Sequence, residues 1–522
     1  MKKQHMRDLH STKASLARPY RSMSNAFTQF TQNHRPEKPF LTSAGGEVLA
    51  TYADFETETG RYLDALSALG IKPGDRVAVQ VEKSPQVLFL YFACLRGGII
   101  YLALNTAYQK EEIRYFIEDA EPALFVADPA KATEAAALGA KLVHTMDRDG
   151  TGSLRDLASR STSSDHVEPV SVDDTAVILY TSGTTGRPKG AMITHGNIVS
   201  NTRTLCQAWQ WSSTDVMLHA LPIFHVHGLF VGTHLPVMEG SSIIFLPQFQ
   251  PVEILNQLPN ATVFMGVPTY YTRLLDAGIN QSHTTTIRLF TSGSAPLLPQ
   301  TFAAFEEATG HTIVERYGMT ETGMNTSNPI TGPRKPGTVG LPLEGVLYRI
   351  VDDEGSPVGR MTPGNLQVKG PNVLKGYWRK PEQTAASFSE DGYFDTGDIA
   401  ETDEDGYVKI VGREKDLIIS GGLNVYPIEV ETVINRDPGV VESAVIGVPH
   451  ADFGEAVIAV IVCGDQSQLA PESLIEHLKA SIANFKVPKR IIIVDQLPRN
   501  TMGKVQKNAL RAQYETLFDE TA

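Results

Sequence analysis

Short apolar runs, many of them rich in β-branched residues, recur along residues 24 to about 410, and helix-length segments separate them. This alternation predicts sheets covered by helices, which is an α/β fold. The clearest predicted strands are residues 77–81, 123–127, 175–180, 262–266 and 287–291. Between Pro342 and Val411 the Asp-Gly and Pro-Gly turns follow one another closely. Such spacing favours antiparallel hairpins, and we expect a small β-barrel-like part that closes the large domain.

A compact unit follows the polar segment Gly412-Arg-Glu-Lys-Asp416. Its pattern predicts helices near residues 427–435 and 471–484 and strands at residues 440–447, 456–462 and 490–494. We interpret the unit as a small α+β domain. The predicted organisation is an N-terminal arm over residues 1–23, a large domain over residues 24–414 and a small C-terminal domain over residues 415–522.

Composition and charge exclude several classes of protein. The chain has 522 residues and a formal net charge of -13, which argues against a nucleic-acid binder with a broad basic face. The longest apolar run, residues 87–95, stops at Arg96 and is too short to span a bilayer. Cys94, Cys206 and Cys463 lie far apart and show neither a disulfide framework nor zinc spacing. We therefore expect free thiols in a reducing compartment.

The N-terminal arm is basic, with Asp8 as its single acid over the first 22 residues. It has no apolar segment of the kind found in secretory signals. We expect a disordered arm on a cytoplasmic protein, with a mitochondrial transit peptide as the alternative.

The segment Tyr180-Thr-Ser-Gly-Thr-Thr-Gly-Arg-Pro-Lys-Gly190 carries the clearest chemistry. Its glycines let successive backbone amides turn toward one anion, its hydroxyls add donors, and Lys189 adds positive charge. These groups suit a triphosphate, although the spacing of a Walker A loop is absent. A predicted strand before the loop and the apolar residues 191–193 after it distinguish it from a mobile surface turn.

The same segment resembles the phosphate loop of the adenylate-forming superfamily, which contains acyl-CoA synthetases, adenylation domains of peptide synthetases and beetle luciferases. Four further stretches resemble motifs of that superfamily and occur in its order: residues 315–322, 393–398, 412–416 and 498–504. The resemblance covers nearly the whole chain after the arm. It implies a ligase that uses ATP to join a carboxylic acid to coenzyme A through an acyl-adenylate.

The resemblance also implies roles for the motif residues. Lys504 would bridge the charges that develop on the acid and the α-phosphate, and Glu321 with Thr181 would hold Mg²⁺ on the phosphates; we expect these three residues to be catalytic. Tyr317 would stack on adenine, and Asp398 would accept the ribose hydroxyls. The residues expected to bind ATP, Mg²⁺ or CoA are Thr181, Ser182, Gly183, Thr184, Thr185, Gly186, Lys189, Ser294, Glu315, Arg316, Tyr317, Gly318, Met319, Thr320, Glu321, Asp398, Arg413, Lys415, Gly421 and Gly422.

In this superfamily one active site serves two half-reactions, because the small domain rotates between adenylation and thioester formation. Lys415 matches the hinge position. Arg413 would reach the ribose or the phosphates. Gly421 and Gly422 would shape the tunnel for the CoA arm after the rotation.

Several stretches resemble malonyl-CoA synthetases in particular, among them residues 225–230, 288–296 and 315–329. A dicarboxylate needs a cation for its distal carboxylate, and we predict Arg288 for that role because a guanidinium offers the planar fork that a carboxylate prefers. Glu239 counts against malonate, since a basic residue would suit an acidic substrate better. The predicted acid-binding residues are His225, Arg288, Ser292, Gly293 and Met324.

Malonate is the predicted acid, with methylmalonate as a second candidate. The alternatives are a CoA ligase for another short-chain or aryl acid, and an adenylation enzyme that loads a carrier protein in trans. A non-catalytic nucleotide-binding relative should have lost Lys504 or Glu321, and both are present. We expect the acid, ATP and CoA as partners, no nucleic acid, no membrane span, and a monomer or homodimer.

Overall fold

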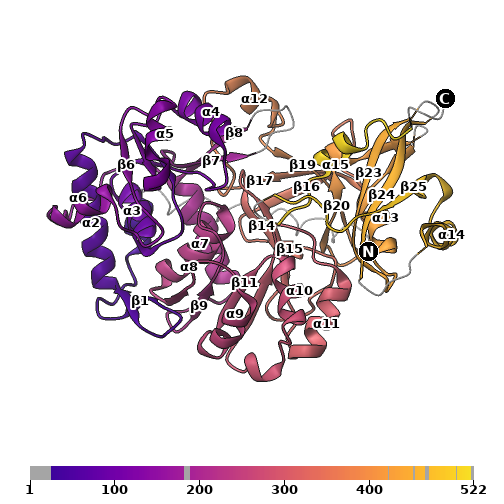
Figure 1. Ribbon diagram of the computed structural model, residues 1–522, viewed down its shortest axis with the longest axis horizontal. Coiled ribbons are helices and arrows are strands. Elements are labelled where there is room, and N and C mark those ends of the chain that lie inside the picture. Colours follow the sequence, from indigo (N-terminus) through magenta and orange to yellow (C-terminus); the bar gives the residue numbers. More distant parts are fainter. Residues whose placement is uncertain are drawn as a thin grey trace, which may run out of the picture.

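The described residues, 25–181, 188–420, 423–450, 453–464, 470–500 and 503–518, form helices and four β-sheets in this computed structural model. In Figure 1 two large sheets and their helices occupy one end of the molecule, and the C-terminal domain, orange to yellow, occupies the other. A four-stranded sheet lies between them.

A seven-stranded sheet carries the strand that precedes the glycine-rich loop. Its order is β18-β8-β7-β4-β3-β5-β6. The strands from β7 to β6 run parallel, β8 pairs antiparallel with β7, and β18 pairs antiparallel with β8. The strands are β3 (Arg76–Gln80), β4 (Ile100–Ala103), β5 (Leu124–Ala127), β6 (Val143–Thr145), β7 (Thr175–Thr181), β8 (Lys189–Thr194) and β18 (Gly376–Tyr377). The loop residues 182–187, between β7 and β8, lie outside the described residues.

A nine-stranded sheet has the order β15-β14-β13-β12-β11-β9-β10-β1-β2. Its strands are β1 (Pro39–Thr42), β2 (Val48–Thr51), β9 (Val216–His219), β10 (Ser242–Phe245), β11 (Val263–Gly266), β12 (Leu289–Ser292), β13 (Val314–Met319), β14 (Gly323–Ser327) and β15 (Leu341–Pro342). The strands from β13 to β1 run parallel. Their carboxyl ends therefore meet at one edge, where ligands bind in open α/β sheets.

Helices cover the two large sheets, and a π-helix, His227–Val231, leads into α8. The helices of this part are α1 (Ala26–Phe30), α2 (Tyr52–Ala68), α3 (Pro85–Arg96), α4 (Lys110–Ala120), α5 (Ala132–Ala137), α6 (Ser153–Arg160), α7 (His195–Ala208), α8 (Gly232–Glu239), α9 (Pro251–Gln257), α10 (Pro268–Asp276), α11 (Pro299–Thr309) and α12 (Pro381–Ala386). The longest apolar run of the sequence is α3, which is buried from Val87 to Arg96. No helix among the described residues is long and apolar enough to cross a membrane.

The four-stranded sheet is antiparallel, in the order β16 (Leu347–Val351), β17 (Gly364–Lys369), β19 (Phe394–Thr402) and β20 (Val408–Arg413). The predicted hairpins are present, but they form an open sheet, because no pairing among the described strands joins β20 back to β16. A 3-10 turn, Glu414–Asp416, leads from β20 into the C-terminal domain.

The C-terminal domain has a mixed five-stranded sheet in the order β22-β21-β24-β23, with β25 on the free side of β24. Its elements are β21 (Ile418–Ser420), β22 (Leu423–Val425), α13 (Pro427–Ile434), β23 (Val440–His450), β24 (Gly454–Cys463), α14 (Pro471–Ser481), β25 (Arg490–Ile493) and α15 (Lys507–Gln513). The predicted α+β character is confirmed, together with the two helices and three strands expected there.

Candidate active site

Thr181 and Glu321, the two predicted metal-binding residues, lie in direct contact. Thr181 ends β7, and its hydroxyl donates to Glu321 Oε1 at 2.8 Å. The hydroxyl of Tyr377 lies 3.4 Å from the same oxygen, and the Lys189 ammonium lies 5.0 Å from the centroid of the Tyr377 ring. The structure therefore gathers Thr181, Lys189 and Glu321 beside the glycine-rich loop. The other predicted loop residues, Ser182, Gly183, Thr184, Thr185 and Gly186, lie outside the described residues.

A second cluster joins Tyr317, Asp398 and Arg413, which come from β13, β19 and β20. The Tyr317 hydroxyl donates to Asp398 Oδ2 at 2.6 Å, and Arg413 Nε lies 2.8 Å from Asp398 Oδ1. The Asp398 carboxylate raises the pKa of Arg413, and burial followed by Asp398 raises the pKa of Tyr317. Tyr317 therefore stays a neutral donor. Each carboxylate oxygen can accept a further hydrogen bond, so Asp398 retains capacity for a ligand hydroxyl.

Lys504 reaches this cluster from the C-terminal domain. Its loop is closed by Asn500, whose side chain accepts from Lys504 N at 3.0 Å and whose N–H donates to the Lys504 carbonyl at 2.9 Å. A side chain on the neighbouring Gly503 would meet Thr269 of α10, so the loop lies against the large domain. Burial, and next the nearby Arg413 charge, lowers the pKa of Lys504 to about 8.

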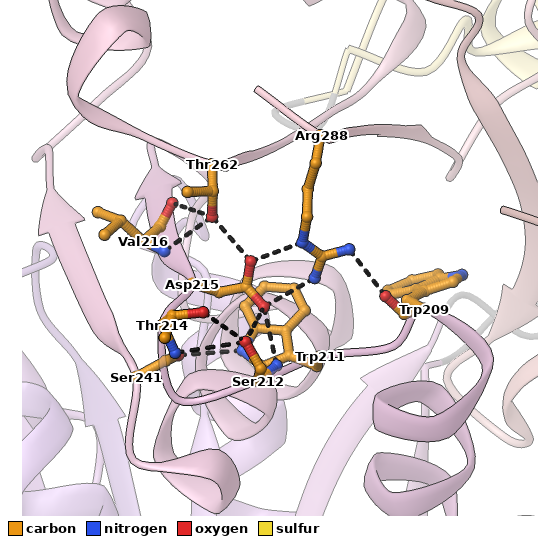
Figure 2. A network of polar contacts seen from close by, with 9 residues as sticks. All are labelled: Trp209, Trp211, Ser212, Thr214, Asp215, Val216, Ser241, Thr262 and Arg288. Carbon is orange, nitrogen blue, oxygen red and sulfur yellow. Dashed lines mark hydrogen bonds and ion pairs between the residues drawn. The ribbon is translucent and has the colours of Figure 1, made fainter. Parts of the chain in front are cut away.

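Arg288, predicted to bind a distal carboxylate, is engaged in contacts within the chain. It immediately precedes β12, at the amino end of the strand, whereas Ser292 lies at the carboxyl end. Its guanidinium binds Asp215 through Nε at 2.6 Å and Nη2 at 2.7 Å, and Nη1 donates to the Trp209 carbonyl at 2.9 Å (Figure 2). Asp215 is buried and also accepts from Thr262. The guanidinium is therefore committed to an internal ion pair, which speaks against the role predicted for Arg288.

Arg316 is the arginine at the carboxyl end of the parallel strands. It is 3% exposed, and its Nε and Nη2 have no hydrogen-bond partner among the described residues. The guanidinium lies over Gly293, where an added Cβ would be 2.5 Å from the guanidinium carbon. Burial lowers the pKa of Arg316 to about 10, which leaves it charged at neutral pH. A buried cation with free donors is an anion site, because an unsatisfied buried charge is costly.

Further unpaired polar atoms surround Arg316. The hydroxyl of Ser292 and Nε2 of His227 are buried without a partner among the described residues. His227 Nδ1 lies 3.3 Å from the Ser294 hydroxyl, and Ser294 adopts a left-handed φ of 70°. Burial, followed by the nearby Lys504 and Arg316, lowers the pKa of His225 to about 3, so this ring is neutral. Neutral donors therefore converge on one place with the cations Arg316 and Lys504.

Met324 closes the inner side of this region. Its side chain is buried, and the Asn201 amide binds both its N–H, at 3.0 Å, and its carbonyl, at 2.9 Å. A cavity next to it is lined by Asn201, Phe230, Thr320 and Gly323, among others. The predicted acid residues His225, Ser292, Gly293 and Met324 thus lie on elements around the Arg316 guanidinium, and Arg288 does not.

The remaining predicted residues lie along the same motif or at the hinge. Glu315 is buried, accepts from Gly337 N at 3.3 Å, and has its pKa raised to about 8 by burial. Gly318 must lack a side chain, since a Cβ would lie 2.1 Å from the Gly323 carbonyl. Met319 contacts the Tyr317 hydroxyl through its sulfur at 4.0 Å.

Lys415 lies in the 3-10 turn, where burial followed by Arg413 lowers its pKa. Gly421 and Gly422 lie outside the described residues.

Comparisons with known proteins match almost the whole chain to proteins of one family. Residues 28–378 match the AMP-binding enzyme family, and residues 429–504 match the AMP-binding enzyme C-terminal domain. A malonate–CoA ligase from Arabidopsis thaliana is 36% identical over 88% of this chain and 82% of its own length. ATP-bound MatB from Rhodopseudomonas palustris is 50% identical, with a TM-score of 0.93 over 95% of this chain and 100% of that one. Apo MatB, with the same identity and coverage, gives a TM-score of 0.81. The chain therefore belongs to the AMP-binding enzyme family of adenylate-forming proteins.

Proposed function

We propose that the protein is an ATP-dependent malonyl-CoA synthetase. It converts malonate, ATP and CoA into malonyl-CoA, AMP and diphosphate through malonyl-AMP. The observation that carries this proposal is the buried Arg316 guanidinium with unpaired donors at the acid site. The similarity to the Arabidopsis malonate–CoA ligase supports the same substrate.

Arg316 binds the distal carboxylate of malonate in this proposal. Two parallel N–H groups fit the two oxygens of a carboxylate, and the match is strong in a site without water. His227 Nε2 and the Ser292 hydroxyl, both buried and unpaired among the described residues, are further donors to the acid. Met324 limits the length of the acid, because Asn201 holds its backbone in place.

The nucleotide lies between the two polar clusters. Tyr317 and Asp398 bind the adenosine part, and the segment from Thr181 to Lys189 binds the phosphates. Among the described residues, no group of three or more His, Cys, Asp and Glu side chains could hold a metal ion. A single carboxylate nevertheless suits Mg²⁺, which keeps waters and binds phosphate oxygens, and Glu321 with Thr181 fits that requirement. Bound there, Mg²⁺ would neutralise phosphate charge.

Lys504 brings the acid and the α-phosphate together during adenylation. Both groups are anions, so a buried ammonium between them stabilises the transition state. After adenylation the small domain, residues 415–522, rotates about Lys415 on the large domain, residues 24–414. Gly421 and Gly422 then form part of the CoA tunnel, and the thiol attacks the adenylate carbonyl with loss of AMP.

A panel of acids tests the proposed function directly. Release of AMP and diphosphate would be measured with ATP, Mg²⁺ and CoA for malonate, methylmalonate, succinate, acetate, octanoate and 4-coumarate. Malonate is expected to give the highest kcat/KM, with methylmalonate second. Preference for acetate, octanoate or 4-coumarate would agree with a CoA ligase but contradict the proposed dicarboxylate site. Release of AMP and diphosphate without formation of an acyl-CoA would favour an enzyme that loads a carrier protein. We propose a cytoplasmic enzyme, monomeric or homodimeric.

A further inference from the structure

Lys83 is a buried lysine that belongs to neither polar cluster of the active site. It follows β3 of the seven-stranded sheet, and its side chain crosses to His219 at the carboxyl end of β9 in the nine-stranded sheet. The residue is 8% exposed, and none of the ion pairs between described residues involves it. Burial lowers its pKa well below the ordinary lysine value. Burial of a lysine side chain costs free energy, so we expect its contacts to serve a function.

The contacts of Lys83 fix the proton on His219. Nζ of Lys83 lies 2.8 Å from His219 Nδ1 and 2.9 Å from the His219 carbonyl. On the other side of the ring, His219 Nε2 lies 2.9 Å from the Gly228 carbonyl. A carbonyl only accepts, so Nε2 carries the proton and Nδ1 accepts from Lys83. The result is a directed chain of hydrogen bonds from Lys83 through His219 to Gly228.

This chain ends inside the π-helix His227–Val231. The Gly228 carbonyl also accepts from the Thr233 hydroxyl at 2.9 Å. Two glycines make room for the arrangement: a Cβ on Gly232 would lie 2.8 Å from His219 Nε2, and one on Gly228 would lie 2.1 Å from the Pro222 carbonyl. The backbone here is therefore built closely around the His219 ring. Short π-helical segments occur frequently at functional sites.

We propose that Lys83 is a positioning residue for the acid substrate, acting through His219 on the π-helix that carries His227. The chain holds Gly228, and the adjacent His227 bonds to Ser294 on the acid side of the site. The nucleotide side of the site is formed by Thr181, Glu321, Tyr317 and Asp398. Among the described residues, no hydrogen bond joins Lys83, His219 or Gly228 to that side. The inference rests on the proposed function, because it assigns Lys83 to the acid half of that site.

Kinetics of Lys83→Met test this assignment. The variant keeps the unbranched side chain up to the position of Cε and removes the donor, so the His219 ring loses its anchor. We expect the KM for malonate to rise about tenfold, because small displacements of positioning groups weaken binding of the reacting group. The KM for ATP should stay within about twofold of the wild-type value. Lys38→Met is the matched control, since Lys38 also donates to two backbone carbonyls, of Ser213 and Gly240, away from the acid site.

His219→Asn and the double variant provide the second arm. The asparagine side chain retains an acceptor for Lys83 but is too short to reach Gly228, so the same rise in the KM for malonate is expected. The double variant should resemble the worse single variant, because the two residues act as one unit. A rise in both KM values, additive effects, or an unchanged KM for malonate would overturn the proposal. If the wild-type enzyme prefers another acid, the same comparison with that acid tests Lys83 independently of the malonate assignment.

Discussion

At the scale of single residues, the proposed function makes Arg316 the group that determines whether the site accepts a dicarboxylate. Arg316→Met keeps the bulk of the side chain and removes its charged donors. The kcat/KM for malonate is expected to fall about 100-fold, since a hydrogen bond to a charged group contributes about 1.5–3 kcal/mol. The kcat/KM for propionate, which lacks the second carboxylate, should change little. Steady-state kinetics with both acids measure the difference, and an equal loss for both would remove Arg316 from the acid site.

A second single residue, Arg288, is expected to affect the free energy of unfolding when it is changed. Arg288→Ala leaves the Asp215 carboxylate buried without its partner, which should cost about 1–3 kcal/mol, reduced because the arginine side chain is 34% exposed. Thermal unfolding should show a lower Tm, while the KM for malonate stays at the wild-type value. A raised KM for malonate at normal stability would restore the original prediction for Arg288.

The pH dependence of the Asp215 pair provides a check on that result. Burial alone would raise the pKa of Asp215, but hydrogen bonds from Arg288, Ser212 and Thr262 hold it below its ordinary value of 3.8. A lowered folded pKa stabilises the protein above the unfolded pKa, and this contribution disappears as the pH falls through the folded pKa. The stability difference between wild type and Arg288→Ala should therefore be complete at neutral pH and shrink below about pH 4.

The role proposed for Lys504 predicts that adenylation depends on pH. The proposal requires the ammonium form, and the pKa of Lys504 is lowered to about 8 by burial and by Arg413. The kcat/KM for adenylation should therefore fall as the pH rises through about 8, because this ratio reports the free enzyme.

Lys504→Ala should greatly reduce the rate of adenylation and leave thioester formation from preformed malonyl-AMP partly intact. Equal loss of both half-reactions would assign Lys504 another role.

At the scale of elements, the strand pattern predicted much of the fold, because apolar β-branched runs occur where parallel strands are buried on both faces. Strands β3, β5, β7, β11 and β12 were all expected from it. The pattern missed the π-helix, whose residues after His227 are glycine or apolar and whose shape depends on His219 and two glycines. It also missed β21 and β22, which are only three residues each.

The prediction for Arg288 took no account of the direction of β12. Residues 288 and 292 lie at opposite ends of this region, and the partner Asp215 is 73 residues away in the sequence, so no local pattern reveals it. A signal for Arg316 was available. Side chains alternate along a strand, and Tyr317 was assigned to the nucleotide, so its neighbour Arg316 had to point to the opposite face. The acid site could have been placed there from the sequence.

At the scale of the whole molecule, contacts across the domains show an arrangement suited to adenylation. Gln300 of α11 donates to the Asn435 carbonyl after α13 at 3.1 Å, and the Lys504 loop lies against α10. The higher TM-score to ATP-bound MatB than to apo MatB, 0.93 against 0.81, agrees with that arrangement. In the proposed two-step reaction, thioester formation requires these contacts to break, because Lys504 would otherwise occupy the site.

Lys415→Pro should separate the two half-reactions. The 3-10 turn Glu414–Asp416 is closed by the Leu417 N–H, which donates to the Arg413 and Glu414 carbonyls. Proline fixes φ near the value that this turn uses and resists the change that rotation requires. Adenylation, measured as malonate-dependent pyrophosphate exchange, should stay within a few-fold of wild type. Conversion of malonyl-AMP and CoA to malonyl-CoA should fall on the order of 10–100-fold.

Lys415→Ala is the matched control for that experiment, because it removes the same ammonium and leaves the backbone free to rotate. Its ratio of thioester formation to adenylation should remain close to the wild-type ratio. If Lys415→Ala slows thioester formation as much as the proline variant, the side chain and not the backbone matters. If the proline variant slows neither half-reaction, rotation occurs elsewhere, and the boundary between the domains must be moved from residue 415 to another part of the link between β20 and β21.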